Sequence, residues 1–193
     1  MDIQVEHGLW TCTILALLLL VLPLDWILSA AAAALIHELS HIVAVMWTGG
    51  HVHAVKIGLG GAVITTSPMV LWKSMVCVAA GPAGSLCLLL AARYMPRMAV
   101  CGMVQGVFNL LPVWPLDGGR MVSLLANRFF SCDHAEIVCK AISQTVKLTV
   151  IAVCFWVSLA EKWGTSPVFA AGLFLARTRE RKIPCKEAKL AVQ

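Results

Sequence analysis

Of the 193 residues, 60% are hydrophobic and 13% are charged, and the mean hydropathy is +0.85. Soluble domains carry about 25% charged residues, so this composition excludes an ordinary soluble domain and favours a membrane protein. The formal net charge of +5 does not indicate a nucleic-acid partner, because many of the basic residues gather at positions 177–193.

Apolar segments follow one another along the chain. A membrane-spanning helix needs about 20 apolar residues, and the candidate segments are, in order, residues 9–24, 26–47, 69–94, 98–113, 137–159 and 165–176. Residues 52–66 differ, because they are β-prone and are interrupted by Gly58, Gly60 and Gly61. We therefore predict an all-α polytopic membrane protein with about six transmembrane helices. A small membrane-associated β-hairpin or sheet is expected between the second and third helices.

The second apolar segment contains His37-Glu38-Leu39-Ser40-His41, which has the pattern H-E-x-x-H. Residues four apart lie on one face of a helix, so His37 and His41 point the same way. Two imidazoles on one face can bind one Zn²⁺, and Glu38 beside them can act as a general base on a bound water. Ionisable groups are costly at membrane depth and so indicate a functional site. The alternative is a polar cluster without metal that only packs the helices.

A catalytic zinc site usually has three protein ligands, so a third ligand is expected elsewhere. Asp117 is favoured, because it lies between Pro115 and Gly118-Gly119 at the end of the fourth segment. Irregular backbone at membrane depth survives where it lines a cavity or is buried in protein. The alternative role for Asp117 is that of a simple turn residue. The other candidate ligands are His51, His53, His134 and Asp25.

Three stretches together resemble the site-2 protease family of intramembrane zinc metalloproteases, peptidase family M50. They are the H-E-x-x-H motif, Gly81-Pro82-Ala83-Gly84-Ser85 in the third segment, and the run from Asn109 to Arg120. The resemblance covers about residues 10–125. In layout the chain is similar to the sporulation branch, whose members cleave a membrane-tethered sigma-factor precursor. The sequence shows neither the CBS domain of that branch nor a PDZ domain.

The resemblance implies a role for each motif. His37, His41 and Asp117 would be the ligands of one Zn²⁺ per chain, and Glu38 would activate water. Asn109 would position the substrate, with a structural hydrogen bond as the alternative. Gly81 and Gly84 are expected to allow close helix packing, since small residues let membrane helices approach. Residues 52–66 resemble the membrane-associated sheet that receives the substrate in this family.

The predicted function is that of an intramembrane zinc endopeptidase. We expect a metalloprotease domain at residues 1–176, with its motifs within about residues 10–125, and a basic cytoplasmic tail at residues 177–193. The expected partners are the lipid bilayer and a membrane protein substrate, such as a membrane-tethered transcription factor or sigma-factor precursor, without direct contact to nucleic acid. The positive-inside bias places both termini of this multi-pass protein on the cytoplasmic side of a bacterial membrane.

Two other functions fit parts of the sequence. A non-proteolytic membrane transporter or metal-handling protein would also carry polar groups at membrane depth. The internal duplication that marks many transporters is not visible between the two halves. A catalytically inactive relative that acts as a binding partner is the other alternative, and the intact Glu38 argues against it.

Overall fold

The computed structural model describes residues 2–5, 23–58, 61–66, 69–160, 171–172, 174–175 and 178. The chain divides into two compact units, Met1–Leu110 and Leu111–Val192. The first unit contains the H-E-x-x-H motif, and the second contains Asp117.

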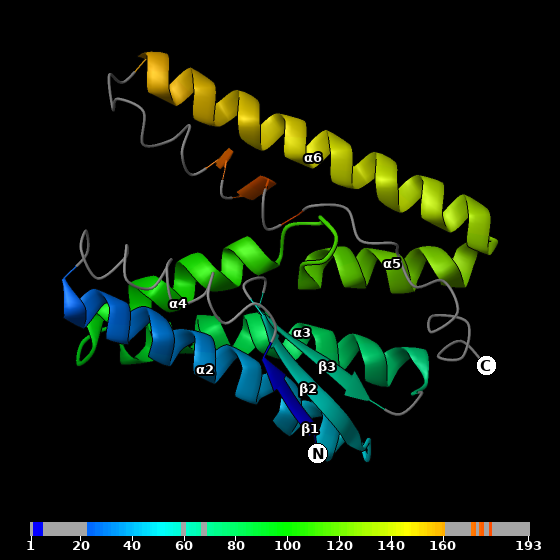
Figure 1. Cartoon of the computed structure of the whole chain (residues 1–193), viewed down its shortest axis with the longest axis horizontal. Helices are drawn as coiled ribbons and strands as arrows, with labels where there is room; N and C mark the ends of the chain where they lie inside the picture. Colours follow the sequence, from blue (N-terminus) through cyan, green and yellow to red (C-terminus); the bar gives the residue numbers. More distant parts are fainter. Residues whose placement is uncertain are drawn as a thin grey trace. The chain divides into compact units, whose positions relative to one another are not determined.

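Helices form the body of the described part of the first unit (Figure 1). They are α2 (Leu24–Trp47), α3 (Leu71–Cys87) and α4 (Pro96–Asn109), and they pack against one another. A short 3₁₀ helix, η1 (Leu88–Ala91), lies between α3 and α4 in the chain. At the contact between α2 and α3, Ala44 and Val45 are buried together with Cys77. Small side chains of this kind allow helices in a membrane to approach closely.

Helix α2 ends where its sequence predicts. The backbone of Gly49 has φ 78°, a left-handed conformation that glycine adopts without cost. The Gly50 N–H donates a hydrogen bond to the carbonyl of Val45 at 2.8 Å, as at many helix C-termini. Lys73 of α3 donates from its Nζ to the carbonyl of Thr48 at 2.8 Å. A cation at this position stabilises the negative end of the helix dipole, so the end of α2 is fastened to α3.

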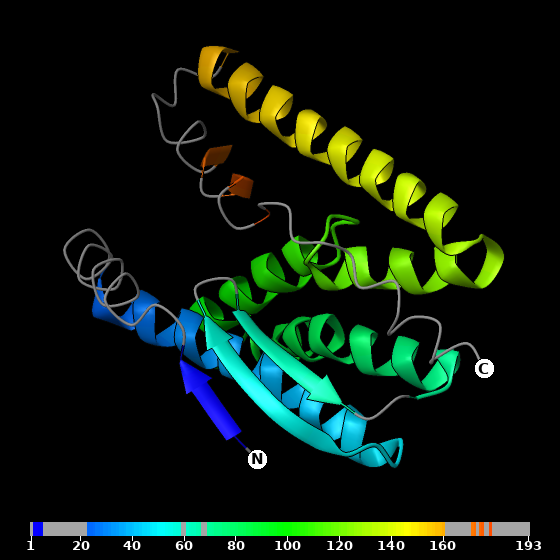
Figure 2. The same cartoon turned by 45° about the vertical axis from the view of Figure 1, so that its right-hand side comes forward.

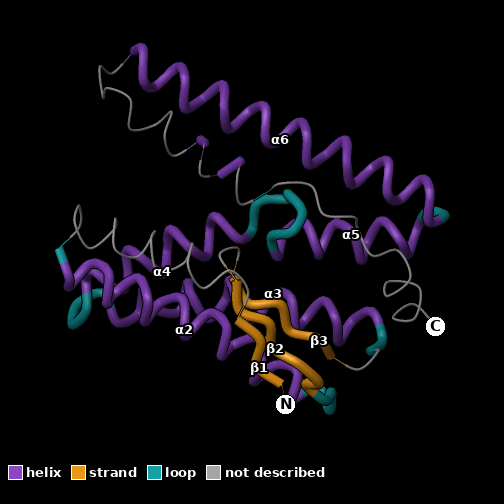
Figure 3. The backbone as a smooth tube through the Cα atoms, viewed as in Figure 1, coloured by secondary structure: helices purple, strands orange, loops and turns teal. Residues whose placement is uncertain are grey.

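A three-stranded sheet also belongs to the first unit (Figure 3). Its strands are β1 (Asp2–Val5), β2 (Val52–Gly58) and β3 (Gly61–Thr66), in the order β1-β2-β3. Strands β2 and β3 are antiparallel, with a register shift at Val52/Ala54, and β1 is parallel to β2. Helix α2 contacts both β2 and β3, and Figure 2 shows the sheet beside this helix.

The predicted fold class, an all-α membrane protein with about six transmembrane helices and a small hairpin or sheet between the second and third, is wrong in two respects. The sheet has a strand beyond the expected hairpin, and this strand comes from the start of the chain at Asp2–Val5. Among the described residues, three helices are long and apolar enough to cross a membrane: Leu24–Trp47, Leu71–Ala91 and Cys132–Ala160.

The predicted fourth span is α4, whose 14 residues extend only about 21 Å at about 1.5 Å per residue. A bilayer core is about 30 Å thick. The helix stops at Asn109 because Pro112 and Pro115 cannot continue its hydrogen bonding. The predicted first and sixth spans, residues 9–24 and 165–176, and the tail at residues 177–193 lie wholly or largely outside the described residues.

The second unit is built on α5 (Asp117–Phe129) and α6 (Cys132–Ala160), which pack against each other. In the core of the second unit, Ala126 of α5 packs against Ala135 and Cys139 of α6. The buried residues of α6 follow one another at intervals of four, which places them on one face: Ala135, Cys139, Ser143 and Lys147. Lys147 donates from its Nζ to the carbonyl of Thr178 at 2.8 Å, so this face of α6 also binds backbone.

Candidate metal centre

His37 and His41 lie on the buried face of α2, with 3% and 8% of their surface exposed. Their spacing of four residues brings the two rings together, as the motif predicts. The ring centroids are 4.9 Å apart and the rings are nearly perpendicular, at 86°. The apolar helix therefore presents two neighbouring imidazoles to the interior of the first unit.

Helix α3 holds both rings from the side. His41 bonds through Nδ1 to the carbonyl oxygen of Cys77 at 2.7 Å. His37 bonds through Nδ1 to the hydroxyl of Ser85 at 2.8 Å. Cys77 and Ser85 are eight residues apart, so they lie on one face of α3 about two turns from each other.

These partners select the tautomer of each ring. A carbonyl oxygen only accepts a hydrogen bond, so Nδ1 of His41 carries the proton and Nε2 carries the lone pair. The side-chain nitrogen of Asn109 lies 3.2 Å from Nε2 of His37. An amide nitrogen only donates, so Nε2 of His37 is also the acceptor, and its Nδ1 donates to Ser85. Both rings therefore present the Nε2 lone pair, which is the form that binds a metal ion.

Gly81 lies midway between Cys77 and Ser85 and leaves space for the ring of His41. A Cβ atom at this position would overlap Nε2 of His41. A Cβ atom at Gly84 would likewise overlap the hydroxyl and the Cβ of Ser40. The expectation that both glycines allow close packing of α2 and α3 agrees with this geometry. At Gly81 the close approach also accommodates a candidate ligand.

Asn109 is the last residue of α4 and is 4% exposed. Its amide donates to the same lone pair of His37 that a metal ion would take. The side chain is thus within hydrogen-bonding distance of a candidate ligand atom.

Glu38 lies between the histidines on α2 and is partly exposed. At about 100° per residue, Glu38 and Ser40 lie on opposite sides of the line through His37 and His41. Glu38 therefore lies on one flank of α2. An apolar groove runs along the other flank, beside Ser40.

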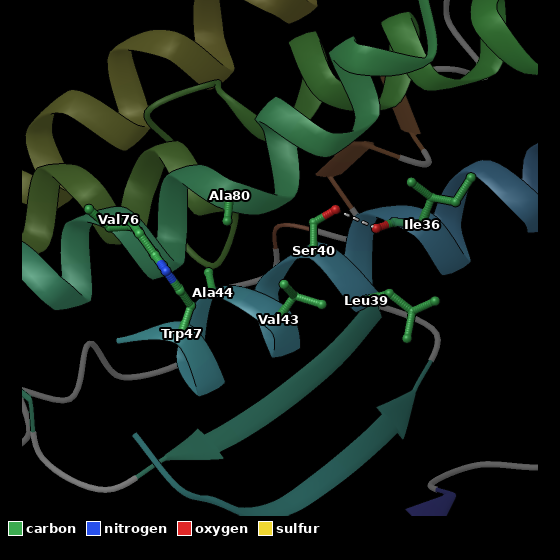
Figure 4. Close-up of a pocket in the computed structure, with 8 residues that line it drawn as sticks. All are labelled: Ile36, Leu39, Ser40, Val43, Ala44, Trp47, Val76 and Ala80. Atoms are coloured by element: carbon green, nitrogen blue, oxygen red, sulfur yellow. Dashed lines mark hydrogen bonds between the residues drawn. The ribbon is translucent and has the colours of Figure 1, made fainter. Parts of the chain in front are cut away.

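That groove lies between α2 and α3 and has a volume of about 500 Å³. Its lining residues are Ile36, Leu39, Ser40, Val43, Ala44, Trp47, Val76 and Ala80 (Figure 4). Ser40 is the only polar residue among them, and its hydroxyl donates to the carbonyl of Ile36 at 2.7 Å. No His, Cys, Asp or Glu lines the groove, so it is not the candidate metal centre.

Asp117 is the first residue of α5, in the second unit. A carboxylate is favourable at this end of a helix, where the backbone N–H groups point outward. Among the described residues of the first unit, no other His, Cys, Asp or Glu forms a three-residue cluster with His37 and His41. The described residues of the first unit therefore do not supply the third ligand that a catalytic zinc site requires.

The other candidate ligands lie in different settings. Asp25 forms an ion pair with Arg97, and it is about 18 Å from His37 along α2 at about 1.5 Å per residue. His134 is exposed on α6 and bonds to the hydroxyl of Ser131 at 2.7 Å. His51 is exposed beyond the end of α2. The side chain of His53, in β2, lies outside the described residues.

The residues present fit a zinc ion. Zn²⁺ binds imidazole nitrogen, and zinc-binding histidines usually donate their other ring N–H to a protein acceptor. His41 does this toward the Cys77 carbonyl and His37 toward the Ser85 hydroxyl. The rings are thus already in the tautomer and orientation that the ion requires.

The sequence did not reveal the supporting residues on α3. Ser85 was visible as part of a motif without an assigned role, and the carbonyl of Cys77 has no sequence signature at all. The signal that could have identified Ser85 is a hydroxyl in an apolar helix, one turn after a glycine. A buried hydroxyl needs a hydrogen-bonding partner, and the nearest motif that offers one is H-E-x-x-H.

The chain matches known proteins in sequence and in fold. The model of Peptidase family M50 matches residues 66–154. Zinc metalloprotease Rip3 of Mycobacterium tuberculosis, in strains H37Rv and Erdman, is 31% identical over 153 residues. This match covers 66% of the chain, which spans 39% of the length of Rip3.

The Site-2 Protease from Methanocaldococcus jannaschii has the same fold, with a TM-score of 0.64 at 16% identity. The likeness covers 94% of this chain and 92% of that one.

The family match contains Gly81, Ser85, Asn109 and Asp117, while the H-E-x-x-H motif precedes it. The matches agree with the family that the three motifs predicted and with zinc as the expected cofactor. With three helices that can cross a bilayer, the chain is an integral membrane protein. In sequence the chain matches peptidase family M50 over residues 66–154, and in fold it matches a site-2 protease.

Proposed function

We propose that this protein is an intramembrane zinc endopeptidase, which cleaves a peptide bond in a membrane-embedded or membrane-adjacent protein. The observation that carries the proposal is the pair of buried imidazoles on α2, both held through Nδ1 by other residues of the first unit. Such an arrangement has no evident use as packing, because buried polar groups are costly in lipid. It is suited to binding a metal through Nε2.

The ligands in this proposal are His37, His41 and Asp117. A zinc ion held there supplies a Lewis acid that polarises a carbonyl and makes water acidic. Its location on an apolar helix limits the access of bulk water, which strengthens every electrostatic interaction at the site.

Two side chains complete the chemistry. Glu38 accepts a proton from the attacking water on its carboxylate and later delivers this proton to the leaving amine. Asn109 donates from its amide to the carbonyl oxygen of the scissile bond, where negative charge develops. The proximity of its amide to Nε2 of His37 supports this role.

The substrate in this proposal is a membrane protein, of which a membrane-tethered transcription factor or sigma-factor precursor is an example. A helical substrate must unwind before attack, because its carbonyls are engaged in its own hydrogen bonds. We propose that it adds as a strand to the outer edge of β3, since β2 is already paired on both sides.

We also propose that both termini face the cytoplasm of a bacterium. Strand β1 pairs with β2, which follows the end of α2, so the start of the chain lies on the same side as the sheet. The basic residues at positions 177–193 favour the cytoplasmic side for the other end. Reporters fused before Met1 and after Gln193 test this, and a periplasmic signal from either fusion would contradict it.

Cleavage is tested with purified protein in lipid vesicles, together with a panel of membrane-tethered transcription factors and sigma-factor precursors. We expect a cleaved fragment that disappears with a zinc chelator and returns when zinc is added. Cleavage that persists with Glu38→Gln would contradict the proposal. Zinc transport across the vesicle membrane without any cleavage would favour the metal-handling alternative.

The strand-addition proposal is tested at β3. Successive N–H groups of a strand alternate between its two edges, so one of Val63 and Ile64 has its N–H toward β2 and the other has it outward. Val63→Pro and Ile64→Pro each remove one of these N–H groups. We expect the outward-facing variant to lose cleavage while it keeps its zinc, and Ala at the same position to have little effect. Equal effects of Pro and Ala would contradict strand addition.

A further inference from the structure

The segment that leads into α5 is largely bonded to itself. Pro112 and Pro115 have no N–H to donate. The Val113 N–H donates to the carbonyl of Leu111 at 2.7 Å, and the Leu116 N–H donates to the carbonyl of Val113 at 2.8 Å. The chain therefore forms a tight turn over Val113–Leu116, immediately before Asp117.

One backbone donor of this turn bonds outside it. The Trp114 N–H donates to the hydroxyl oxygen of Ser143 on α6 at 3.2 Å. Ser143 is 8% exposed and lies on the buried face of its helix, between Cys139 and Lys147. The bond connects α6 to the backbone three residues before Asp117.

The first turn of α5 packs directly on the same backbone. A Cβ atom at Gly119 would lie 2.5 Å from the nitrogen of Trp114 and from the oxygen of Val113. Real Cβ atoms do not approach so closely, so only glycine allows this contact. A displacement of Trp114 would therefore shift the first turn of α5, which begins with Asp117.

We propose that Ser143 is a positioning residue for the carboxylate of Asp117. Its hydroxyl fixes the Val113–Leu116 turn to α6, and the turn in turn fixes the start of α5. Ser143 acts through the backbone and does not bind the metal. The proposal rests on the proposed function, because it takes Asp117 as a ligand of the zinc ion.

The experiment compares two substitutions of nearly equal shape. Ser143→Thr keeps the hydroxyl, and Ser143→Val replaces it with a methyl group. Thr145→Ala is the control, because Thr145 is exposed on the same helix and donates to the carbonyl of Ala141. Zinc affinity of the purified full chain is measured by competition with a chelator. The visible spectrum of the cobalt-substituted protein reports the geometry of the ligands.

We expect Ser143→Val to weaken zinc binding by roughly 10-fold or more, as for other residues that orient ligands, and to change the cobalt spectrum. Ser143→Thr and Thr145→Ala should retain the affinity and the spectrum of the wild type. Thermal unfolding of the metal-free variants shows whether Val and Thr are tolerated equally. Wild-type zinc affinity and cobalt spectrum in Ser143→Val would overturn the proposal.

Asp117→Ala separates this inference from the proposed function. If Asp117→Ala loses zinc and Ser143→Val does not, the role of Ser143 is wrong and the ligand set stands. If Asp117→Ala binds zinc as the wild type does, the ligand set is wrong and the role of Ser143 fails with it.

Discussion

In the first unit, the candidate ligands stand on a regular helix, and a second helix orients them through a side chain and a carbonyl. In the second unit, Asp117 stands at a helix start, and its position depends on a turn, a glycine contact and one backbone bond. The two regions thus fix their candidate ligands by different means. The spacing of His37 and His41 follows from any α-helix, while the location of Asp117 requires a specific irregular backbone.

This difference predicts which substitutions matter in each region. Around the histidines, changes of single side chains should alter ring orientation while the backbone stays in place. Around Asp117, changes that disturb backbone bonds should have the greater effect.

The largest effect is expected when a ligand itself is removed. His37→Ala, His41→Ala and Asp117→Ala should each weaken zinc binding by more than the roughly 10–100-fold typical of supporting residues. Zinc content after dialysis against a weak chelator measures this. Similar losses in all three variants would unite the two regions in one site, whereas full zinc retention in Asp117→Ala would separate them.

Glu38→Gln should separate catalysis from metal binding. The amide cannot accept a proton, so the cleavage rate should fall by about 10²–10⁴-fold. Zinc content should remain that of the wild type, because Glu38 is not a proposed ligand. Turnover near the wild-type rate in this variant would exclude Glu38 as the general base.

Gly81→Ala and Gly84→Ala form a matched pair on α3. Each new Cβ would crowd α2, so both should lower the free energy of unfolding by about 1–3 kcal/mol. Only Gly81→Ala displaces the ring of His41, and only this variant should lose zinc affinity. Equal zinc affinities in two folded variants would show that the space at Gly81 serves packing alone.

Ser85→Ala should have the smallest effect of this series. It removes the partner of Nδ1 of His37 and should weaken zinc binding by roughly 10-fold. Ser74→Ala is the control, because Ser74 lies on the same helix and donates to the carbonyl of Met69. If both variants bind zinc equally, Ser85 does not orient the ring.

The sequence predicted the histidine pair because residues four apart lie on the same face of any α-helix. It did not predict the bond between His37 and Ser85, because the two lie 48 positions apart and only the packing of α2 on α3 brings them together. The β-prone pattern of residues 52–66 located two strands. Strand β1 was missed, because four residues that pair only with a distant strand carry too short a pattern to recognise.

The span prediction was wrong because hydropathy reports apolar composition and does not report where a helix ends. Asn109 ends α4 after 14 residues, yet the apolar pattern continues to Val113. The same prolines that stop the helix create the turn before Asp117. The irregular backbone that misled the span prediction is therefore the feature that prepares the candidate ligand.

X-ray absorption at the zinc edge of the purified protein tests the central claim most directly. We expect one Zn²⁺ per chain, bound by two imidazole nitrogens at about 2.0–2.1 Å and otherwise by oxygen. His41→Ala should reduce the imidazole contribution from two to one. Sulfur ligands at about 2.3 Å would instead indicate binding by cysteine, and that result, or the absence of zinc, would contradict a metal centre at His37 and His41.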